Sequence, residues 1–418
     1  MTRRALALLL ATTGLALLLR VVWLSGQPLL PDDLAVGVTA HNFTRWGWPE
    51  PTMWNHPRLR DSLVALSEQA FGRGPWGLKI WSVAIGTLSV PATGLLVWEL
   101  TGSGVAAVLA SFLLAIDPLH LDFSRQAIND VQLAFFPVAA LAAAWTYRRS
   151  RRCTCLAVAG LLFGLGLATK WSAAAQLLIA LLAVMGDALR SKEPRERASE
   201  LIFVAACLVV LPATVYLLTY LPWFQRGYEL VDLLQFHGRM ALETVTHTGY
   251  GNKLPGYLGE IVQPWRWFLA PVYYLEYALP RGSVGPDPGY IVGVANPLTW
   301  LLVWPACGLA AWTAALRRDE GLTWSVALFL VTYLPFAFAT RPIWTNTALA
   351  VAPFALALVA WAAVQLAKRW RTSVLAWGCV AALLAAVLWP ASMGFPSRVS
   401  DAVVRVLVPA EAWLPRQP

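Results

Sequence analysis

Residues 5–37 read ALALLLATTGLALLLRVVWLSGQPLLPDDLAVG, an apolar run followed by two adjacent acids, Asp32 and Asp33. The run is long enough for the ~20 residues with which a helix crosses a bilayer. Because lipid does not tolerate bare charge, acids at the edge of a membrane span are often functional. The alternative is that the pair only solvates the start of a loop, since acids beside spans are often surface residues. The stretch therefore predicts a first membrane helix with a candidate site at its end.

The composition extends this prediction to the whole chain. Of 418 residues, 58% are hydrophobic and only 13% are charged, whereas soluble domains contain roughly 25% charged residues. We therefore predict an all-α polytopic membrane protein with about 11 transmembrane helices. The apolar runs begin near residues 5, 76, 103, 131, 155, 171, 201, 297, 321, 346 and 374.

Short basic loops predict the orientation, because they favour the cytoplasmic side of a membrane. If the number of spans is odd and the N-terminus is cytoplasmic, all of these basic loops lie on the cytoplasmic side, and the C-terminus lies outside. Two long loops, near 26–75 and 222–292, then share the extracytoplasmic face with the acid pair. The net charge of +9 mostly reflects this bias, so we expect no nucleic-acid partner. The basic clusters are Arg3-Arg4, 148–152, 190–197, Arg317-Arg318 and Lys368-Arg369.

The N-terminal run also has features of a signal peptide, with Arg3 and Arg4 before a leucine-rich stretch. Arg20 interrupts that stretch and no Ala-x-Ala cleavage site follows, so we favour a retained span.

The five cysteines predict neither an outer disulfide nor a metal site. In this topology they fall in spans or on the cytoplasmic side, and Cys153-x-Cys155 is too small a cluster for metal. We predict no cofactor and no metal ligands, although a divalent ion remains possible.

Both long loops predict an amphipathic helix on the membrane surface, since apolar residues recur at three- and four-residue steps. Such spacing encodes a face rather than a chemistry. We see no second soluble domain, so residues 1–418 form one membrane domain, with 1–292 as the catalytic part and 293–418 as C-terminal helices. The two apolar faces are Leu59, Leu63, Leu66 and Ala70, and Tyr228, Val231, Leu234, Gly238 and Leu242.

Charged residues recur at further outer edges, as His56-Pro57, Arg125 with Asp130, and Lys170-Trp171. A carboxylate can accept a proton from a hydroxyl, and Arg or Lys can hold a phosphate. Together they suit transfer of a group from a lipid phosphate to an alcohol. The phosphate leaves readily once its charge is neutralised, so one carboxylate suffices, unlike the pair used in glycoside hydrolysis.

Several of these segments, in order, resemble motifs of the protein O-mannosyltransferase family, from about residue 20 to about residue 360. Several ordered motifs are far harder to obtain by chance than one. The segments are Pro31-Asp32-Asp33-Leu34-Ala35-Val36-Gly37, similar to the family's Asp-Glu motif; His56-Pro57-Arg58-Leu59, similar to His-Pro-Pro-Leu; Asp117-Pro118-Leu119-His120 through Ser124-Arg125, Asn129-Asp130 and Phe135-Phe136; Gly166 to Trp171; and Asn296-Pro297-Leu298-Thr299-Trp300.

The resemblance implies a GT-C glycosyltransferase fold and an inverting reaction with a polyprenyl-phosphate sugar donor. It makes Asp32 the catalytic base, while Asp33 stands at the family's Glu position with a side chain one methylene shorter. Arg125 would contact the phosphate or the acid pair, Asp130 would hold a cation or a sugar hydroxyl, and His56 would help to bind donor or acceptor. The other expected substrate-binding residues are Arg58, which replaces the family's second Pro, Lys170 and Arg341.

We therefore expect a mannosyltransferase of the plasma membrane that acts extracytoplasmically on a Ser or Thr hydroxyl of an exported protein. No trefoil insert is present in the second long loop, so the acceptor can differ from that of the eukaryotic enzymes. A second hypothesis moves a sugar or aminosugar onto a lipid or envelope glycan, as in the lipid A aminoarabinose transferases. A transporter is the third, but its charges would lie near the bilayer midplane on broken helices.

The alternative to substrate binding is that some of these charged residues have purely structural roles. Arg125 and Asp130 could form a mutual ion pair, because charges at membrane depth often pair with each other. Lys170 could simply extend its amine to the interface.

Overall fold

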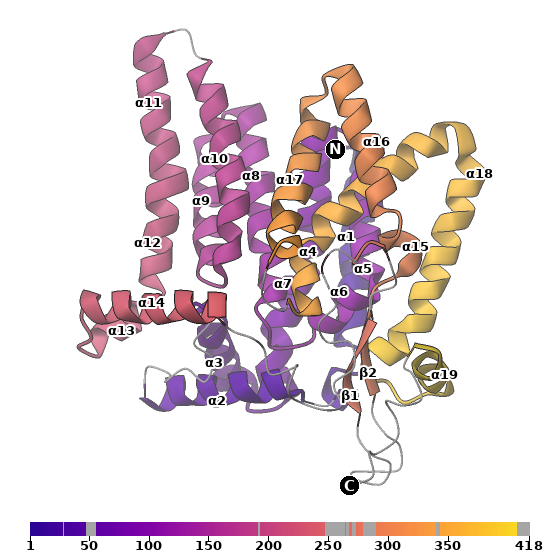
Figure 1. The fold of residues 1–418 in the computed structure, drawn as a ribbon, viewed down its shortest axis with the longest axis horizontal. Helices are drawn as coiled ribbons and strands as arrows, with labels where there is room; N and C mark the ends of the chain where they lie inside the picture. Colours follow the sequence, from indigo (N-terminus) through magenta and orange to yellow (C-terminus); the bar gives the residue numbers. More distant parts are fainter. Residues whose placement is uncertain are drawn as a thin grey trace.

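The computed structural model describes residues 1–27, 29–46, 56–190, 193–246, 264, 267–269, 273–278, 290–339 and 343–407. Upright helices stand side by side in a bundle, and most of the remaining helices lie toward one end of it (Figure 1). The helices of the bundle are α1 (Arg3–Val21), α4 (Pro75–Thr101), α5 (Gly104–Ile116), α8 (Phe136–Ser150), α9 (Cys153–Leu167), α10 (Ala174–Leu189), α11 (Pro194–Ala205) continuing into α12 (Leu211–Leu218), α16 (Val303–Arg317), α17 (Glu320–Ala337) and α18 (Ala352–Ser392). The others are α2 (Pro31–Trp46), α3 (Leu59–Phe71), α6 (Pro118–Phe123), α7 (Asp130–Leu133), α13 (Leu221–Gln225), α14 (Leu230–Thr246), α15 (Pro297–Trp300) and α19 (Arg398–Leu407).

Helices of the bundle have the length and hydropathy of membrane spans. Seven helical segments of the described residues are long and apolar enough to cross a bilayer. Two further apolar helices, α5 and α9, have 13 and 15 residues. Trp370 breaks the helical geometry of α18, with φ −129° and ψ 46°, and the two limbs run in opposite directions (Figure 1). The predominantly helical membrane architecture is confirmed, while the number of about 11 spans stays a prediction.

Basic connections and surface helices occupy opposite ends of the bundle (Figure 1). The α10–α11 and α16–α17 connections and the bend of α18 lie at the upper end, and α2, α13, α14 and α19 lie at the lower end. This separation agrees with the predicted arrangement of basic and long loops, while the side that faces the cytoplasm stays a prediction. The basic residues near the upper connections include Arg190, Arg195, Arg317, Arg318, Lys368 and Arg369.

The core is built around α4, which packs against α1, α5 and α8. Gly94 permits the contact with α5, because a Cβ there would lie 2.3 Å from Ser111 Oγ. The Ser111 hydroxyl also donates to the Val90 carbonyl across the same interface, at 3.0 Å. Close approach and a buried hydrogen bond therefore fix α5 against the central helix.

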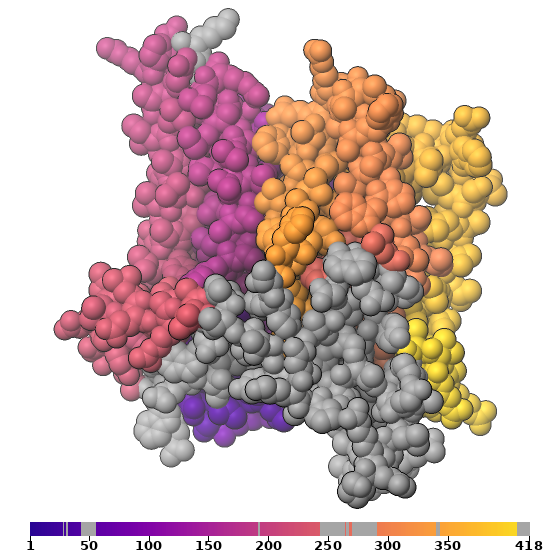
Figure 2. Space-filling view, viewed as in Figure 1, coloured from indigo at the N-terminus to yellow at the C-terminus, as the bar shows by residue number. Residues whose placement is uncertain are grey.

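The predicted loop helices are confirmed, but each has a buried face that the spacing did not reveal. In α3 the polar side is buried, since Arg60 is 5% exposed and Asp61 1%, while Leu66 is 55% exposed. In α14 the predicted apolar face is exposed, and a second face formed by Leu233, Phe236 and Met240 is buried. Figure 2 shows α13 and α14 projecting from the bundle below α12.

A short sheet lies at the lower end and was not predicted from the sequence. β1 (Tyr273–Ala278) and β2 (Tyr290–Val294) pair antiparallel, with Tyr273 opposite Val294 and Ala278 opposite Tyr290. Val292 and Val294 of β2 pack with Leu388 of α18 and Val404 of α19. The sheet therefore links the end of α18 to the C-terminal helix.

Candidate active site

Asp33 is a buried anchor. Its Oδ2 lies 3.1 Å from Lys79 Nζ and accepts from the Leu30 amide at 3.0 Å, and its Oδ1 accepts from the Ala127 amide at 2.7 Å. The side chains of Asp33 and Lys79 are both 0% exposed. These contacts join the first turn of α2 to α4 and to the segment between α6 and α7. They favour a positioning role for Asp33 over the direct substrate contact predicted from the sequence.

Asp32, in contrast, remains open to solvent at the start of α2. Adjacent residues on a helix project about 100° apart, so the anchoring of Asp33 turns Asp32 outward. Although the side chain is exposed, surrounding protein atoms displace water and raise the pKa of Asp32 above its usual value. The charge of Arg60 opposes that shift, and the charges of Asp33 and Asp130 add to it. Asp32 therefore lies within electrostatic reach of Arg60 and Asp130.

Asp130 pairs with Lys170, at 2.7 Å between Oδ1 and Nζ. The two side chains are 4% and 13% exposed. Asp130 begins α7, and Lys170 follows the end of α9; Asn129 Nδ2 donates to the Thr169 carbonyl at 3.0 Å beside them. The ion pair thus joins two segments 40 residues apart, and it differs from the Arg125–Asp130 pair considered as an alternative.

Two arginines share the carboxylate of Asp61. Arg58 Nη1 lies 2.9 Å from Oδ2, and Arg60 Nη2 lies 2.8 Å from Oδ1. Two cations against one acid leave an excess positive charge at the start of α3. Arg60 was not among the predicted site residues, although Arg58-x-Arg60-Asp61 is visible in the sequence.

The Arg58 guanidinium has N–H donors without hydrogen-bond partners among the described residues. Arg58 is 1% exposed, and its Nε and Nη2 have no hydrogen-bond partner within the described ranges. Its guanidinium lies 5.3 Å from the centre of the Phe236 ring of α14. Burial lowers the pKa of Arg58, and Asp61 opposes that shift. Unsatisfied guanidinium N–H groups in such a place are suited to phosphate oxygens.

Arg125 is directed elsewhere. Its Nη1 donates to the Val22 carbonyl at 2.9 Å and lies 2.8 Å from Met393 Sδ, so its hydrogen bonds go to neither acid of the Asp32–Asp33 pair. Arg125 is 0% exposed, and its Nε and Nη2 lack partners in the part of the chain that is described. The predicted phosphate contact of Arg125 stays a prediction, and its observed contacts hold the end of α1 to the end of α18.

His56 and Arg341 complete the predicted set. His56 is half-buried two residues before Arg58, and the Leu59 amide donates to the Ala168 carbonyl at 3.1 Å. This hydrogen bond places the His-Pro-Arg segment beside the segment of Lys170. Arg341 lies outside the described residues.

An aromatic network covers the Lys170 segment and was missed from the sequence. The indole of Trp171 stacks on the His237 ring of α14, with centroids 5.9 Å apart, and donates to the Tyr216 hydroxyl at 3.0 Å. Tyr216 lies 2.6 Å from His237 Nε2, and His237 Nδ1 lies 2.7 Å from the Leu233 carbonyl. Because a carbonyl only accepts, Nδ1 carries the proton and Nε2 accepts from Tyr216. The network fixes α14 over the site, but a lone His in an amphipathic helix gave no signal of it.

A mostly apolar cavity of about 180 Å³ is lined in part by Trp171, the residue after Lys170. It starts at Trp171 and lies between the beginning of α10 and the end of α17. Gln176 and Thr332 are hydrogen-bonded to each other at 2.8 Å on its wall. The remaining lining residues are Ser172, Ala175, Val331, Pro335, Phe336 and Ala350.

Comparison with known proteins agrees with this architecture. The family described as "Dolichyl-phosphate-mannose-protein mannosyltransferase" matches residues 52–227. The polyprenol-phosphate-mannose–protein mannosyltransferase of Corynebacterium glutamicum is 24% identical, with 75% of this chain and 71% of that protein covered. The protein of the same name from Mycobacterium tuberculosis is 26% identical, with 72% and 68% covered.

Solved structures show the same fold. A chain of the Saccharomyces cerevisiae protein O-mannosyltransferase Pmt1-Pmt2 complex bound to the sugar donor superposes with a TM-score of 0.81 at 11% identity, over 97% of this chain and 92% of that chain. ArnT from Cupriavidus metallidurans bound to undecaprenyl phosphate gives 0.61 at 16% identity, over 91% and 64%. The GT-C fold expected from the sequence is therefore confirmed, and the chain is similar in sequence to protein O-mannosyltransferases over most of its length.

Proposed function

We propose that this protein transfers a mannosyl group from a polyprenyl-phosphate carrier to a Ser or Thr hydroxyl of an exported protein. The match to the mannosyltransferase family over residues 52–227 and the protein acceptors in the names of the similar proteins support the reaction class. The observation that carries the assignment of the site is the contrast within one acid pair. Asp33 is fully engaged in holding α2, whereas Asp32 presents an exposed carboxylate beside a cationic cluster.

Asp32 is the proposed general base. The acceptor oxygen attacks the anomeric carbon of the mannosyl group while its proton passes to the Asp32 carboxylate. The bond between that carbon and the phosphate oxygen breaks, its electron pair stays with the polyprenyl phosphate, and a single displacement inverts the anomeric centre. A carboxylate that keeps solvent access and a raised pKa suits this role, because its basicity is greater than that of an ordinary aspartate.

Lys170, Arg58 and Arg60 are the proposed phosphate ligands. Trp171, the residue after Lys170, lines the apolar cavity, which suits the first isoprene units of a lipid whose phosphate lies at the Lys170 amine. Arg58 offers two unsatisfied donors. Since the phosphate gains charge as its bond to the sugar breaks, cations aimed at it stabilise the transition state more than the ground state.

Asp130 and Asp33 position this machinery. Asp130 directs the amine of Lys170, and Asp33 fixes the helix turn that presents Asp32. His56 lies in the segment that joins α3 to the Lys170 region, where it would contact donor or acceptor. Arg125 and Arg341 are also proposed as substrate ligands, on the basis of the sequence alone.

We further propose that the reaction occurs on the extracytoplasmic face, with the N-terminus in the cytoplasm. The position of the basic connections at the end of the bundle opposite to α2 and α14 supports this orientation (Figure 1).

Reconstituted protein tests the proposal directly. Proteoliposomes receive polyprenyl-phosphate [³H]mannose and a Ser/Thr-rich peptide from an exported protein, and label in the peptide is released by β-elimination. Transfer to the peptide supports the proposal. Label that moves only into lipid or glycan would transfer the assignment to the second acceptor class, and hydrolysis or no turnover would contradict it.

A further inference from the structure

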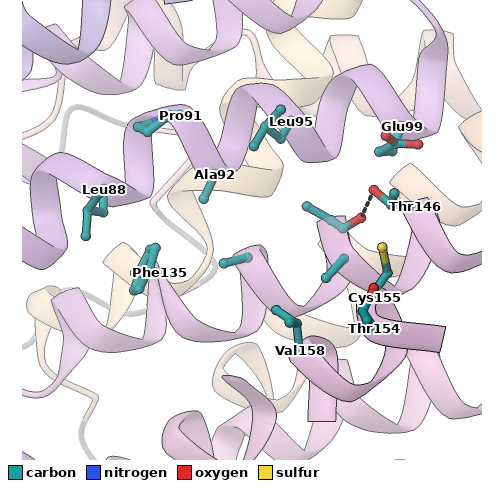
Figure 3. A pocket seen from close by; sticks show the side chains of 13 residues that line it. Leu88, Pro91, Ala92, Leu95, Glu99, Phe135, Thr146, Thr154, Cys155 and Val158 are labelled. Atoms are coloured by element: carbon teal, nitrogen blue, oxygen red, sulfur yellow. Dashed lines mark hydrogen bonds between the residues drawn. The ribbon is translucent and has the colours of Figure 1, made fainter. Parts of the chain in front are cut away.

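A groove runs between α4, α8 and α9, separate from the cavity at Trp171, and it does not include any residue of the catalytic cluster (Figure 3). Its volume is about 450 Å³. Leu88, Leu95 and Val158 line it and are 48%, 43% and 47% exposed, so the groove opens on the lateral surface of the bundle. That surface faces lipid in a membrane protein.

The groove forms because the side chains that α8 contributes to its wall are small. Ala139, Ala142 and Ala143 line the groove at positions i, i+3 and i+4, which share one helix face. Phe135 lines it one turn before Ala139, with Leu88 nearby (Figure 3). The width and apolar lining of this part suit one acyl chain.

The opposite end of the groove is polar. Glu99, Thr146, Thr154 and Cys155 gather there in Figure 3. The side chain of Glu99 is only 8% exposed, and its Oε1 lies 3.2 Å from Arg149 Nη2. Its Oε2 is buried and has no hydrogen-bond partner in the described part of the protein. A buried carboxylate oxygen without a protein donor can accept a hydrogen bond from a bound group.

Two arginines are associated with the polar end, Arg149 through its contact with Glu99 and Arg152 as the residue before α9. Arg149 is 55% exposed at its side chain, and Arg152 is exposed. Arg152 is also the N-cap residue of α9, and no side chain caps that helix start. Helix N-termini favour anions through their free N–H groups, and two arginines strengthen the preference for a phosphate.

We propose that this groove binds a glycerophospholipid with a primary ammonium headgroup, as in phosphatidylethanolamine. One acyl chain fills the space between α4 and α8, the phosphate lies near Arg149, Arg152 and the start of α9, and the ammonium donates to Glu99 Oε2. The sugar donor is a poorer occupant. Lys170 follows the far end of the 15-residue helix α9, about 22 Å from its first residue, so a phosphate at Arg152 is remote from the catalytic cluster.

Two lipids with identical acyl chains test the proposal. Phosphatidylethanolamine and phosphatidylcholine carry the same phosphate and the same net charge, but only the first has N–H donors. Delipidated protein is titrated with each lipid, and bound lipid is counted by native mass spectrometry. We expect about tenfold tighter binding of phosphatidylethanolamine, the size of one charge-assisted hydrogen bond. Equal affinity for the two lipids in the unmodified protein would overturn the headgroup assignment.

Two variants locate the binding site. Ala143→Phe fills the groove and should weaken binding of both lipids at least tenfold, whereas Ala205→Phe on the exposed face of α11 should not. Glu99→Gln leaves the volume almost unchanged and should abolish the preference between the lipids. If Ala143→Phe binds as the unmodified protein does, or Glu99→Gln keeps the full preference, the groove is not the site. None of these readouts depends on mannosyl transfer.

Discussion

Asp33 Oδ2 lies 3.1 Å from Lys79 Nζ, and neither side chain has any exposed surface. A buried ion pair gains little net stability over apolar residues, but removal of one partner leaves an uncompensated buried charge. The ion pair therefore fixes the position of α2 against α4. Through α2 it also determines the direction in which the Asp32 side chain points.

Asp33→Asn should destabilise the protein by about 3–5 kcal/mol, because it leaves the Lys79 ammonium without its carboxylate. Thermal unfolding in detergent measures this loss. The single variant Lys79→Met should cost a similar amount, and the double variant should be clearly more stable than the sum of the two losses. Strict additivity would show that the two side chains do not act as a pair.

The pH profile of mannosyl transfer reports on Asp32. Since only the unprotonated carboxylate accepts the hydroxyl proton, kcat/KM should fall as the pH decreases through the raised pKa of Asp32, above the ordinary aspartate value of about 3.9. Arg60 lowers this pKa, so Arg60→Gln should move the acid limb to higher pH. Arg405→Gln on α19 is the matched control and should leave the limb in place, whereas an unmoved limb in Arg60→Gln would argue against Asp32 as the titrating group.

Lys170→Met should raise the KM for the sugar donor by about 10- to 100-fold, because it removes a charge-assisted contact to the phosphate. Lys170→Arg keeps the charge next to Asp130 and should recover part of that loss. Donor titration at saturating peptide separates KM from kcat. If the KM of Lys170→Met equals that of the unmodified protein, Lys170 does not bind the donor phosphate, and only its ion pair with Asp130 remains as its role.

Arg58→Gln should weaken binding of polyprenyl phosphate by about tenfold or more, since the unsatisfied Nε and Nη2 groups are lost as phosphate donors. Isothermal titration with short-chain polyprenyl phosphate measures the effect without turnover. Arg405→Gln again serves as the control of equal charge change. Unaltered affinity in Arg58→Gln would remove this side chain from the phosphate site.

Much of the architecture could be predicted because hydropathy and charge act locally along the chain. Long apolar runs identified the membrane helices, and basic residues separated the two ends of the bundle. The ordered motifs indicated the GT-C fold before any geometry was known. The amphipathic helices α3 and α14 also followed from spacing alone.

The partners within the site could not be predicted, because they depend on tertiary contacts. Asp130 and Lys170 meet across 40 residues of chain, whereas the alternative considered from the sequence paired Asp130 with Arg125. Which of two adjacent acids is buried depends on the rotation of α2, a helix that was not predicted from the sequence. His237 was missed for the same reason, since its partners Trp171 and Tyr216 come from other helices.

The central claim is that Asp32 takes the proton from the acceptor hydroxyl, and single-turnover transfer by Asp32→Asn tests it most directly. The rate constant should fall by about 10²- to 10⁴-fold, while donor affinity stays within a few-fold and the melting temperature is unchanged. Asp401→Asn, an exposed substitution on α19, provides the matched control and should transfer normally. Transfer by Asp32→Asn at the unmodified rate would contradict the account.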